Sequence, residues 1–375
     1  METVGVNLSG KHVFLISDAD KFFFLLADSL ITKLSVDPNA IVAVVYKSGR
    51  RVGDIQRISG VGYYSHEQLA LEDYLLAKSL TFMSLRSWNS YIAKEIIDLD
   101  PRIIQKLFVF ITDDEVARWV MNVQKNGELS PDPDQYISEH CVYVLKKIQY
   151  FICPENYFKK VISNVLERSD LKFYDASIVF DILPNESSSQ LFDVFKNENN
   201  ARSVKKRILF GTKSTGWRSL ILLLRFLFNR SSSFDFEFFV FVNKYRKILV
   251  ECYLIYKRAL GHSNVNVVYL SHLPPEAYNS LVAICSHVIL QGRGGASTAR
   301  LYVKWARGEL LVKKNTPNSY FFKDVYGVAI EEYSDRSELV DILIREPNEQ
   351  RYRENRNIIV REEVRSLKVL SKVYW

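Results

Sequence analysis

The segment from Val267 to Asp324 repeats one order of elements: an apolar strand, a polar loop and a helix. Short apolar strands that alternate with helical stretches are typical of βαβ units, in which the crossover helix makes consecutive strands parallel. A glycine-rich polar turn follows the middle strand of this segment, at Gln291–Thr298. The order therefore predicts a doubly wound α/β domain whose ligands bind beside the carboxyl ends of its strands. The strands and helices expected here are Asn266–Leu270, Pro275–Cys285, His287–Gln291, Ser297–Lys304 and Leu310–Lys313.

The same alternation extends over the rest of the chain. Strands are expected at Lys11–Ser17, Ala40–Lys47, Lys106–Thr112, Tyr150–Cys153, Ser177–Ile182, Arg207–Phe210 and Phe236–Val242. Helices are expected at Lys21–Leu34, Trp217–Phe228 and Tyr245–Leu260, and His66–Asp98 is expected to be mostly helical. Weak structure formers fill Leu183–Ser203. We therefore predict an α/β chain of two Rossmann-like domains that face a cleft: residues 1–183, a linker at 184–203, and residues 204–375 with a C-terminal helical tail.

Composition narrows the class of protein. A chain of 375 residues can bury two cores. The four cysteines are scattered and form no C-x-x-C pair, which favours a reduced, cytoplasmic compartment. The polar first residues do not resemble a signal peptide, and no uncharged run reaches the roughly 20 residues that span a bilayer. The net charge of +7 predicts an anionic partner: nucleic acid, an anionic membrane or a phosphorylated substrate.

Two loops of the second half have the composition of anion sites. Gly211–Gly216 follows one apolar strand and Gln291–Thr298 follows another, and each precedes a helix whose N–H groups and dipole favour a phosphate. Lys213 and Arg293 add positive charge, and Ser297 and Thr298 are expected at the cap of the second helix. Neither loop matches a Walker A motif or G-x-G-x-x-G, so a dinucleotide is disfavoured. An ordinary strand-to-helix turn capped by Ser214 or Thr215 is the alternative.

Acidic side chains follow strands of the first half. Asp18 and Asp20 come after the first strand, and Asp113 and Asp114 come after the strand at Lys106–Thr112. A carboxylate there can accept the proton of an attacking hydroxyl, although helix capping is the competing role. The six histidines show no i,i+4 pair and no cysteine partner, so no metal site and no cofactor are expected.

Several of these segments resemble a known family. Its motifs correspond here to Ser17-Asp18, Ile111–Glu115, Gly211–Thr215, the tyrosine helix and loop from Ala277 to Thr298, and Lys314–Asp324. They resemble the transferases that add 4-acetamido-4,6-dideoxygalactose, from a TDP-linked donor, to the lipid-linked intermediate of enterobacterial common antigen. More broadly, they resemble two-domain GT-B glycosyltransferases. The chain departs from the family in its basic Gly211–Thr215 loop and in lacking an aromatic-Gly-Ala before Asp113.

The resemblance implies a metal-independent glycosyltransferase of bacterial surface polysaccharide or lipopolysaccharide synthesis. Its first domain would bind a glycan or polyprenyl-linked acceptor, with Asp113, Asp114 or Asp18 as the catalytic carboxylate. Its second domain would bind a nucleotide-diphospho-sugar as co-substrate. The donor-binding residues that it implies are Gly211, Thr212, Lys213, Ser214, Thr215, Asn243, Leu273, Tyr278, Arg293, Gly294, Gly295, Ser297, Thr298 and Asn315.

A peripheral contact with the inner membrane is a further expectation. Arginines flank an apolar face in Trp217–Arg230, although packing of this helix on the sheet is the alternative explanation. Basic and aromatic residues alternate in Tyr143–Lys160, where a solvated helix face is the alternative. Two other classes of protein stay open. One is a nucleic-acid-binding protein, which the lack of a basic tail or RNP motif disfavours, and the other is a non-catalytic Rossmann-like binding protein.

Overall fold

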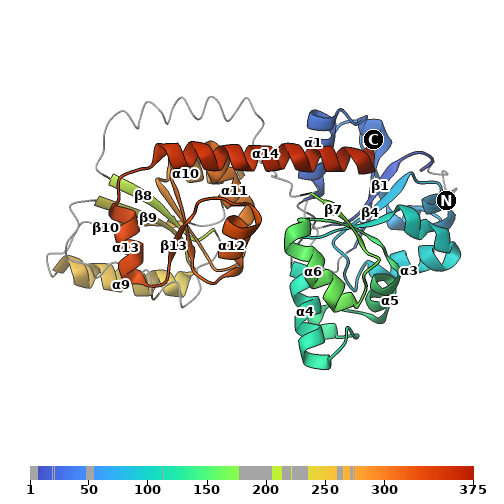
Figure 1. Ribbon diagram of the computed structural model, residues 1–375, viewed down its shortest axis with the longest axis horizontal. Coiled ribbons are helices and arrows are strands. Elements are labelled where there is room, and N and C mark those ends of the chain that lie inside the picture. The colour runs from blue at the N-terminus through green and yellow to red at the C-terminus, as the bar shows by residue number, and fades with distance from the viewer. Residues whose placement is uncertain are drawn as a thin grey trace. The chain divides into compact units, whose positions relative to one another are not determined.

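The chain forms two compact units (Figure 1). The computed structural model describes residues 7–18, 20, 22–47, 55–112, 114–176, 205–212, 221, 235–259, 265–270, 273 and 275–375. Unit 1 comprises Met1–Phe180 and Glu363–Trp375, and unit 2 comprises Asp181–Glu362. Each unit holds one parallel sheet, which confirms the predicted fold class of two Rossmann-like domains.

The sheet of unit 1 has seven strands in the order β3-β2-β1-β4-β5-β6-β7. All neighbouring strands are parallel. The chain therefore fills one side of β1 first and the other side afterwards, which is the doubly wound arrangement. The strands are β1 (His12–Ser17), β2 (Ile41–Tyr46), β3 (Gly62–Ser65), β4 (Ser79–Met83), β5 (Leu107–Phe110), β6 (Tyr150–Cys153) and β7 (Lys172–Asp175).

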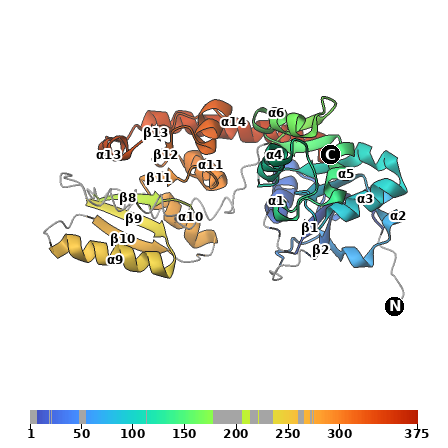
Figure 2. The same ribbon diagram turned by 90° about the horizontal axis from the view of Figure 1, so that it is seen from below.

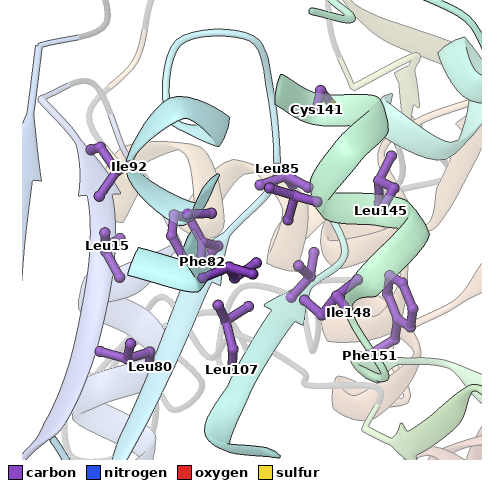
Figure 3. Packing of buried hydrophobic residues seen from close by; sticks show 14 of the residues in the cluster. Leu15, Leu80, Phe82, Leu85, Ile92, Leu107, Cys141, Leu145, Ile148 and Phe151 are labelled. Atoms are coloured by element: carbon purple, nitrogen blue, oxygen red, sulfur yellow. The ribbon is translucent and has the colours of Figure 1, made fainter. Parts of the chain in front are cut away.

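Helices cover both faces of this sheet because successive side chains of a strand point to opposite sides. In β1, Val13 and Leu15 pack in one core cluster while Phe14 and Ile16 pack in another. The first cluster contains α3 (Ser90–Leu99), α4 (Asp114–Asn126), α5 (Glu139–Lys147) and α6 (Glu155–Leu166), and part of it is drawn in Figure 3. The second contains α1 (Phe23–Leu34) and the end of α14 (Glu349–Tyr374). Unit 1 also has α2 (Leu71–Leu75) and the short helices η1 (Pro38–Ala40), η2 (His66–Gln68), η3 (Pro101–Lys106) and η4 (Pro133–Gln135).

The sheet of unit 2 has six strands in the order β10-β9-β8-β11-β12-β13, again all parallel. This order repeats the doubly wound pattern, with its switch point between β8 and β11. The strands are β8 (Lys205–Phe210), β9 (Asp235–Phe241), β10 (Val265–Leu270), β11 (His287–Leu290), β12 (Glu309–Lys313) and β13 (Glu331–Tyr333). The helices are α9 (Lys244–Ala259), α10 (Pro275–Ile284), α11 (Ala296–Trp305), α12 (Pro317–Tyr320), η5 (Phe321–Val325) and α13 (Arg336–Ile344).

The C-terminal helix α14 contributes residues to both units, whereas the sequence analysis assigned the whole tail to the second domain. In unit 2, Arg351 forms ion pairs with Glu309 and Glu331, and the Tyr352 hydroxyl donates to Glu309 at 2.9 Å. In unit 1, the fully buried Tyr374 packs in the core and its hydroxyl lies 3.0 Å from the Thr81 hydroxyl. Each end of α14 therefore has its own buried polar and apolar contacts.

The sequence interpretation missed one central strand. The region His66–Asp98 was expected to be mostly helical, but β4 (Ser79–Met83) lies within it and pairs with β1 and β5. Its five residues, Ser-Leu-Thr-Phe-Met, are all buried, and a segment this short gives too few periods to separate it from the helical stretches on either side. The strand expected at Ser177–Ile182 and the helix expected at Trp217–Phe228 lie outside the described residues, apart from the helical residue Ile221.

We predict that the buried His12 makes stability depend on pH. Burial, and secondly the charge of Lys78, lower its pKa from 6.5 to about 4. Between these values the unfolded chain binds a proton that the folded chain does not, so stability falls as the pH falls through this window. A shift of this size corresponds to roughly 3 kcal/mol. Urea unfolding at about pH 7 and about pH 4.5 measures the effect.

The His12→Gln variant should lose less stability over the same pH range than the wild type, because it cannot take up the proton. His140→Gln, at an exposed position, is the control and should behave like the wild type. An equal loss of stability in His12→Gln and the wild type would contradict the assignment.

Candidate functional site

Two loops of unit 2 meet at the switch point of its sheet. Gly211 and Thr212 follow β8, and the glycine-rich turn Gln291–Gly295 follows the neighbouring strand β11. The backbone N–H of Gly211 donates to the carbonyl of Ile289 at 2.9 Å, which extends the strand pairing to the start of the loop. Because carboxyl ends of parallel strands share one edge of a sheet, both predicted anion loops lie at the same edge.

Close approach between these loops requires glycine. A Cβ atom on Gly295 would lie 2.2 Å from the Thr212 hydroxyl oxygen, and a Cβ on Gly211 would lie 3.0 Å from the Gln291 amide nitrogen. Both glycines also have positive φ, +78° at Gly295 and +80° at Gly211, a region that side-chain-bearing residues rarely adopt. Gly295 is therefore constrained by backbone conformation and by contact, whereas Gly211 is constrained mainly by conformation because the end of the Gln291 side chain can move.

Helix α11 begins directly after the glycine turn. Gly295 is the N-cap residue, and no side chain among the described residues caps the helix there. The N–H groups of Ala296, Ser297 and Thr298 consequently lack intrahelical acceptors, and the positive end of the helix dipole lies beside them. The expectation that Ser297 and Thr298 would be at the cap was wrong, because two left-handed glycines, Gly294 and Gly295, place the cap earlier. Exposed N–H groups and this dipole suit an anion.

Asn318 holds the glycine turn in place. It is 4% exposed, and its side-chain amide donates to the carbonyls of Gln291 at 2.6 Å and Gly294 at 2.9 Å. Its own N–H donates to the Gly292 carbonyl at 3.2 Å. The sequence analysis selected Asn315 from this segment and missed Asn318. Asn315 is exposed with φ of 57°, a left-handed turn conformation that asparagine tolerates.

The other predicted donor residues follow strand ends along the same edge. Tyr278, in α10, donates its hydroxyl to Thr298 at 3.3 Å, and burial raises its pKa to about 12. Asn243, after β9, accepts the N–H of Arg246 at 3.0 Å and so caps α9. Leu273 lies after β10, and Arg293 is exposed in the glycine turn. Lys213, Ser214 and Thr215 lie outside the described residues.

The acidic candidates of unit 1 lie at the carboxyl edge of its sheet. Asp18 directly follows β1 and is 6% exposed. Asp20 accepts the N–H groups of Phe22 at 2.8 Å and Phe23 at 2.7 Å, so its carboxylate holds the turn that leads into α1, whose N-cap residue is Phe22. Asp113 and the side chain of Asp114 lie outside the described residues.

The start of α4 has its own buried cap. The Glu115 carboxylate accepts the N–H and the hydroxyl of Thr112, both at 2.8 Å, which is half of a capping box. Glu115 is 2% exposed, and its burial raises its pKa. Thr112 and Glu115 stand three apart in the sequence, a spacing that alone could have indicated this cap. Asp113 and Asp114 are the two residues between them.

A polar cluster after β4 was also missed by the sequence analysis. Asn89, fully buried, donates to the Tyr46 hydroxyl at 3.0 Å and the Ser84 carbonyl at 2.8 Å, and accepts the Arg86 N–H at 2.8 Å. Burial raises the pKa of Tyr46 and keeps it neutral. The Arg86 guanidinium donates to the Ser84 hydroxyl at 3.0 Å. This network fixes the backbone of the loop that carries Arg86.

Arg86 belongs to a row of stacked cationic and aromatic groups. Its guanidinium lies 5.3 Å from the Trp88 ring, Trp88 meets Tyr136 edge to face at 5.5 Å, and Arg118 lies 4.6 Å from the Tyr136 ring. We call Arg86, Trp88, Tyr136 and Arg118 the stacked row. Tyr136 is 42% exposed, and the other three are partly exposed. Aromatic faces flanked by guanidinium groups can hold a sugar ring and an anionic substituent together.

The part of the chain that the structure describes contains no group of three or more metal-ligating side chains. Within those same residues, no helix is both long and apolar enough to cross a bilayer.

Comparison with known proteins supports the fold. No family model matches the sequence, and no curated protein matches it significantly. Among solved structures, Anabaena Alr3699/HepE in complex with UDP and glucose matches with a TM-score of 0.55 at 11% identity, over 96% of this chain and 99% of that one. A UDP-forming α,α-trehalose-phosphate synthase from Burkholderia vietnamiensis matches with a TM-score of 0.55 at 11% identity, over 97% and 98%. A Rickettsia africae glycosyltransferase matches with a TM-score of 0.51 at 9% identity, over 98% of each chain.

These likenesses run over both units and define the architecture as GT-B: two Rossmann-like domains in one chain. They do not extend to the enterobacterial common antigen transferases in particular.

We predict that Gly295→Ala destabilises unit 2 more than Gly327→Ala does. Both glycines have positive φ, which costs an alanine about 1 kcal/mol, but a Cβ on Gly327 meets nothing within 4 Å. The contact of the new methyl group at position 295 with Thr212 should add about 1–3 kcal/mol, measured by chemical denaturation.

The double variant Gly295→Ala/Thr212→Gly tests whether contact is the cause, because it removes the side-chain atoms that the new methyl group would meet. It should recover most of the difference from Gly327→Ala. Equal destabilisation by the two single alanine substitutions would show that the loops do not touch as described.

Proposed function

We propose that this protein is a glycosyltransferase that uses a nucleotide-diphospho-sugar. The observation that carries the proposal is the N-terminus of α11, which no side chain in the described part of the chain caps and which lies beside the residues after β8 at the switch point of unit 2. Ligands of open α/β sheets bind at such points, and helix N–H groups bind phosphate. The fold is shared with glycosyltransferases, including one whose structure holds UDP-glucose.

The donor's pyrophosphate would lie on the N–H groups of Ala296, Ser297 and Thr298. Arg293 extends from the same turn and can neutralise phosphate charge. The buried Asn318 holds the turn through two carbonyls, so the N–H groups are oriented before the ligand arrives. Gly211–Thr215, Asn243, Leu273, Tyr278 and Asn315 complete the proposed donor side.

In the proposed reaction an acceptor hydroxyl attacks the anomeric carbon of the donor sugar. The new glycosidic bond forms as the bond between that carbon and the phosphate oxygen breaks, and the nucleoside diphosphate leaves with the electron pair. The helix dipole and N–H groups stabilise the charge that develops on the leaving phosphate, a role that requires no metal ion. A carboxylate accepts the hydroxyl proton.

Unit 1 would bind the acceptor and supply that carboxylate. We propose Asp113 or Asp114 as the base, with Asp18 as the alternative, because all three follow the carboxyl ends of β5 and β1. Glu115 is an unsuitable base because it is buried and already accepts two hydrogen bonds from Thr112. The stacked row extends along the same edge and offers a surface for a glycan that carries a phosphate or carboxylate.

This acceptor chemistry fits a lipid-linked glycan intermediate of bacterial surface polysaccharide or lipopolysaccharide synthesis. An enzyme of such a pathway would work in the cytoplasm, at the inner membrane where polyprenyl-linked acceptors reside. The stacked row supports the anionic character of the acceptor through Arg86 and Arg118.

We predict that nucleoside diphosphates bind to unit 2. Titration calorimetry with UDP, TDP and GDP, and with the monophosphate CMP, should give binding for at least one of the diphosphates, and that diphosphate should bind more tightly than its own monophosphate. Gly295→Ala should weaken that binding about tenfold or more, since it displaces the turn that carries the N–H groups. Gly327→Ala is the matched control and should leave affinity unchanged.

Absence of binding for all four nucleotides would remove the proposed function. A nucleotide that binds equally well to Gly295→Ala and wild type would place its site elsewhere on the chain.

We predict that Asp113→Asn or Asp114→Asn lowers turnover much more than donor affinity. Loss of a general base typically costs about 10²–10⁴-fold in rate, whereas the pyrophosphate contacts are in the other unit. Release of nucleoside diphosphate from the sugar donor of whichever nucleotide binds measures turnover, and calorimetry measures affinity. Asp134→Asn, at an exposed position in η4, should behave like the wild type. Full turnover in both variants would transfer the base assignment to Asp18.

A further inference from the structure

Helix α9 exposes an apolar stripe on the side that faces away from its own sheet. Tyr245 is 79% exposed, Ile255 62% and Tyr256 56%, and Ile248 and Leu249 follow with 52% and 46%. These residues and the exposed Cys252 recur at intervals of three or four, so they lie on one face of the helix. We call Tyr245, Ile248, Leu249, Cys252, Ile255 and Tyr256 the α9 stripe.

The opposite face of α9 packs against the core of unit 2. Val250 is fully buried and Leu254 is 6% exposed, and both belong to a core cluster with residues of β8, β9 and β10. Figure 2 shows α9 lying beside β10 at the outer side of the unit. The α9 stripe is therefore additional to what the fold needs, and a contiguous apolar surface of this kind marks an interaction site.

The positive charge of α9 favours an anionic partner. The helix sequence contains five basic residues and a single acidic one, Glu251. Lys244 is exposed beside the stripe, and Lys247 is exposed on the side of the helix toward β10, where its ammonium lies 5.1 Å from the Tyr269 ring. A second copy of this chain would bring the same positive charges together, which opposes association. An anionic lipid surface supplies opposite charge to the flanks and an apolar phase to the stripe.

We propose that α9 docks this protein on an anionic lipid bilayer, lying in the plane of the interface with the α9 stripe in the acyl boundary. Tyrosines near both ends of the stripe, Tyr245 and Tyr256, suit the headgroup level, where an aromatic ring stays apolar and a hydroxyl stays hydrated. Ile248, Leu249 and Ile255 lie between them and enter deeper. This surface differs from the two segments that the sequence suggested for membrane contact, and its role does not depend on the proposed glycosyl transfer.

Cys252 provides a direct probe of this docking. It lies in the middle of the stripe and is the exposed cysteine, while Cys141, Cys153 and Cys285 are buried. An environment-sensitive fluorophore on Cys252 of the intact protein should shift to the blue when vesicles of phosphatidylcholine with about 30% phosphatidylglycerol are added. Pure phosphatidylcholine vesicles should give a much smaller shift, and added salt should reduce the shift because it screens the lysines.

Vesicle co-sedimentation tests the same surface without a label. The double variant Ile248→Asp/Ile255→Asp should lower the partition coefficient at least about tenfold, because two apolar side chains no longer enter the acyl boundary. The double variant Val360→Asp/Val364→Asp is the matched control: it adds the same two charges at apolar positions of α14 that are 36% and 61% exposed, and it should partition like the wild type. Lys244→Glu/Lys247→Glu should remove most of the preference for anionic vesicles. Circular dichroism checks that each variant stays folded.

Three outcomes would overturn the proposal. The first is wild-type protein that stays in the supernatant at low salt with anionic vesicles. The second is protein that sediments with vesicles while the label on Cys252 does not shift, which would place the contact on another surface. The third concerns the molar mass of the protein in lipid-free ultracentrifugation. If this mass doubles with protein concentration for the wild type and stays that of a monomer for Ile248→Asp/Ile255→Asp, the stripe binds a second copy of the chain. Loss of nucleotide binding is a separate readout and would bear on the proposed function alone.

Discussion

The close approach of the β8 and β11 loops is the constraint on which the rest of unit 2 depends. These strands are neighbours at the switch point, and the residues that directly follow them touch where two glycines leave room for larger side chains. Gly295 leaves room for Thr212, and Gly211 leaves room for Gln291. The left-handed glycines also end the turn early, so that α11 begins at the sheet edge with N–H groups that no described side chain caps. A side chain at Gly295 would separate the loops and move the helix.

One buried asparagine in each unit forms hydrogen bonds with the backbone of a loop at a strand end. Asn318 supports the glycine turn through two carbonyls, and in unit 1 Asn89 supports the loop after β4 in the same manner. A buried amide that bonds to backbone carbonyls fixes a loop without contributing charge. Both asparagines therefore position other groups, the α11 N–H groups in one unit and Arg86 in the other. The groups that would contact a ligand are therefore different from the asparagine side chains that position them.

The two sheets share one winding pattern but differ in what their carboxyl edges present. In unit 2 the edge offers backbone N–H groups, glycines and Arg293, which suit a diphosphate. In unit 1 it offers Asp18, the stacked row, and the carboxylates of Asp20 and Glu115, which already accept hydrogen bonds from neighbouring residues; the proposed function assigns the glycan and the proton acceptor to this unit. An asymmetric pair of edges of this kind is what a two-substrate reaction needs. The α9 stripe adds a third surface, and its apolar residues are far more exposed than folding alone explains.

The sequence by itself determined the parallel α/β pattern and the position of two glycine-containing loops after strands of the second half. Apolar runs between helical stretches leave few other folds, and glycine-rich turns after such runs identify strand ends. It did not determine β4, because a five-residue segment between helical stretches gives too few periods to separate a strand from a helix. Tertiary structure alone decided that Asn318 holds the glycine turn, that Trp88, Tyr136 and Arg118 stack, and that the apolar residues of α9 face outward. Each depends on contacts between segments far apart in the chain or on which helix face the sheet covers, and local periodicity carries no information about either.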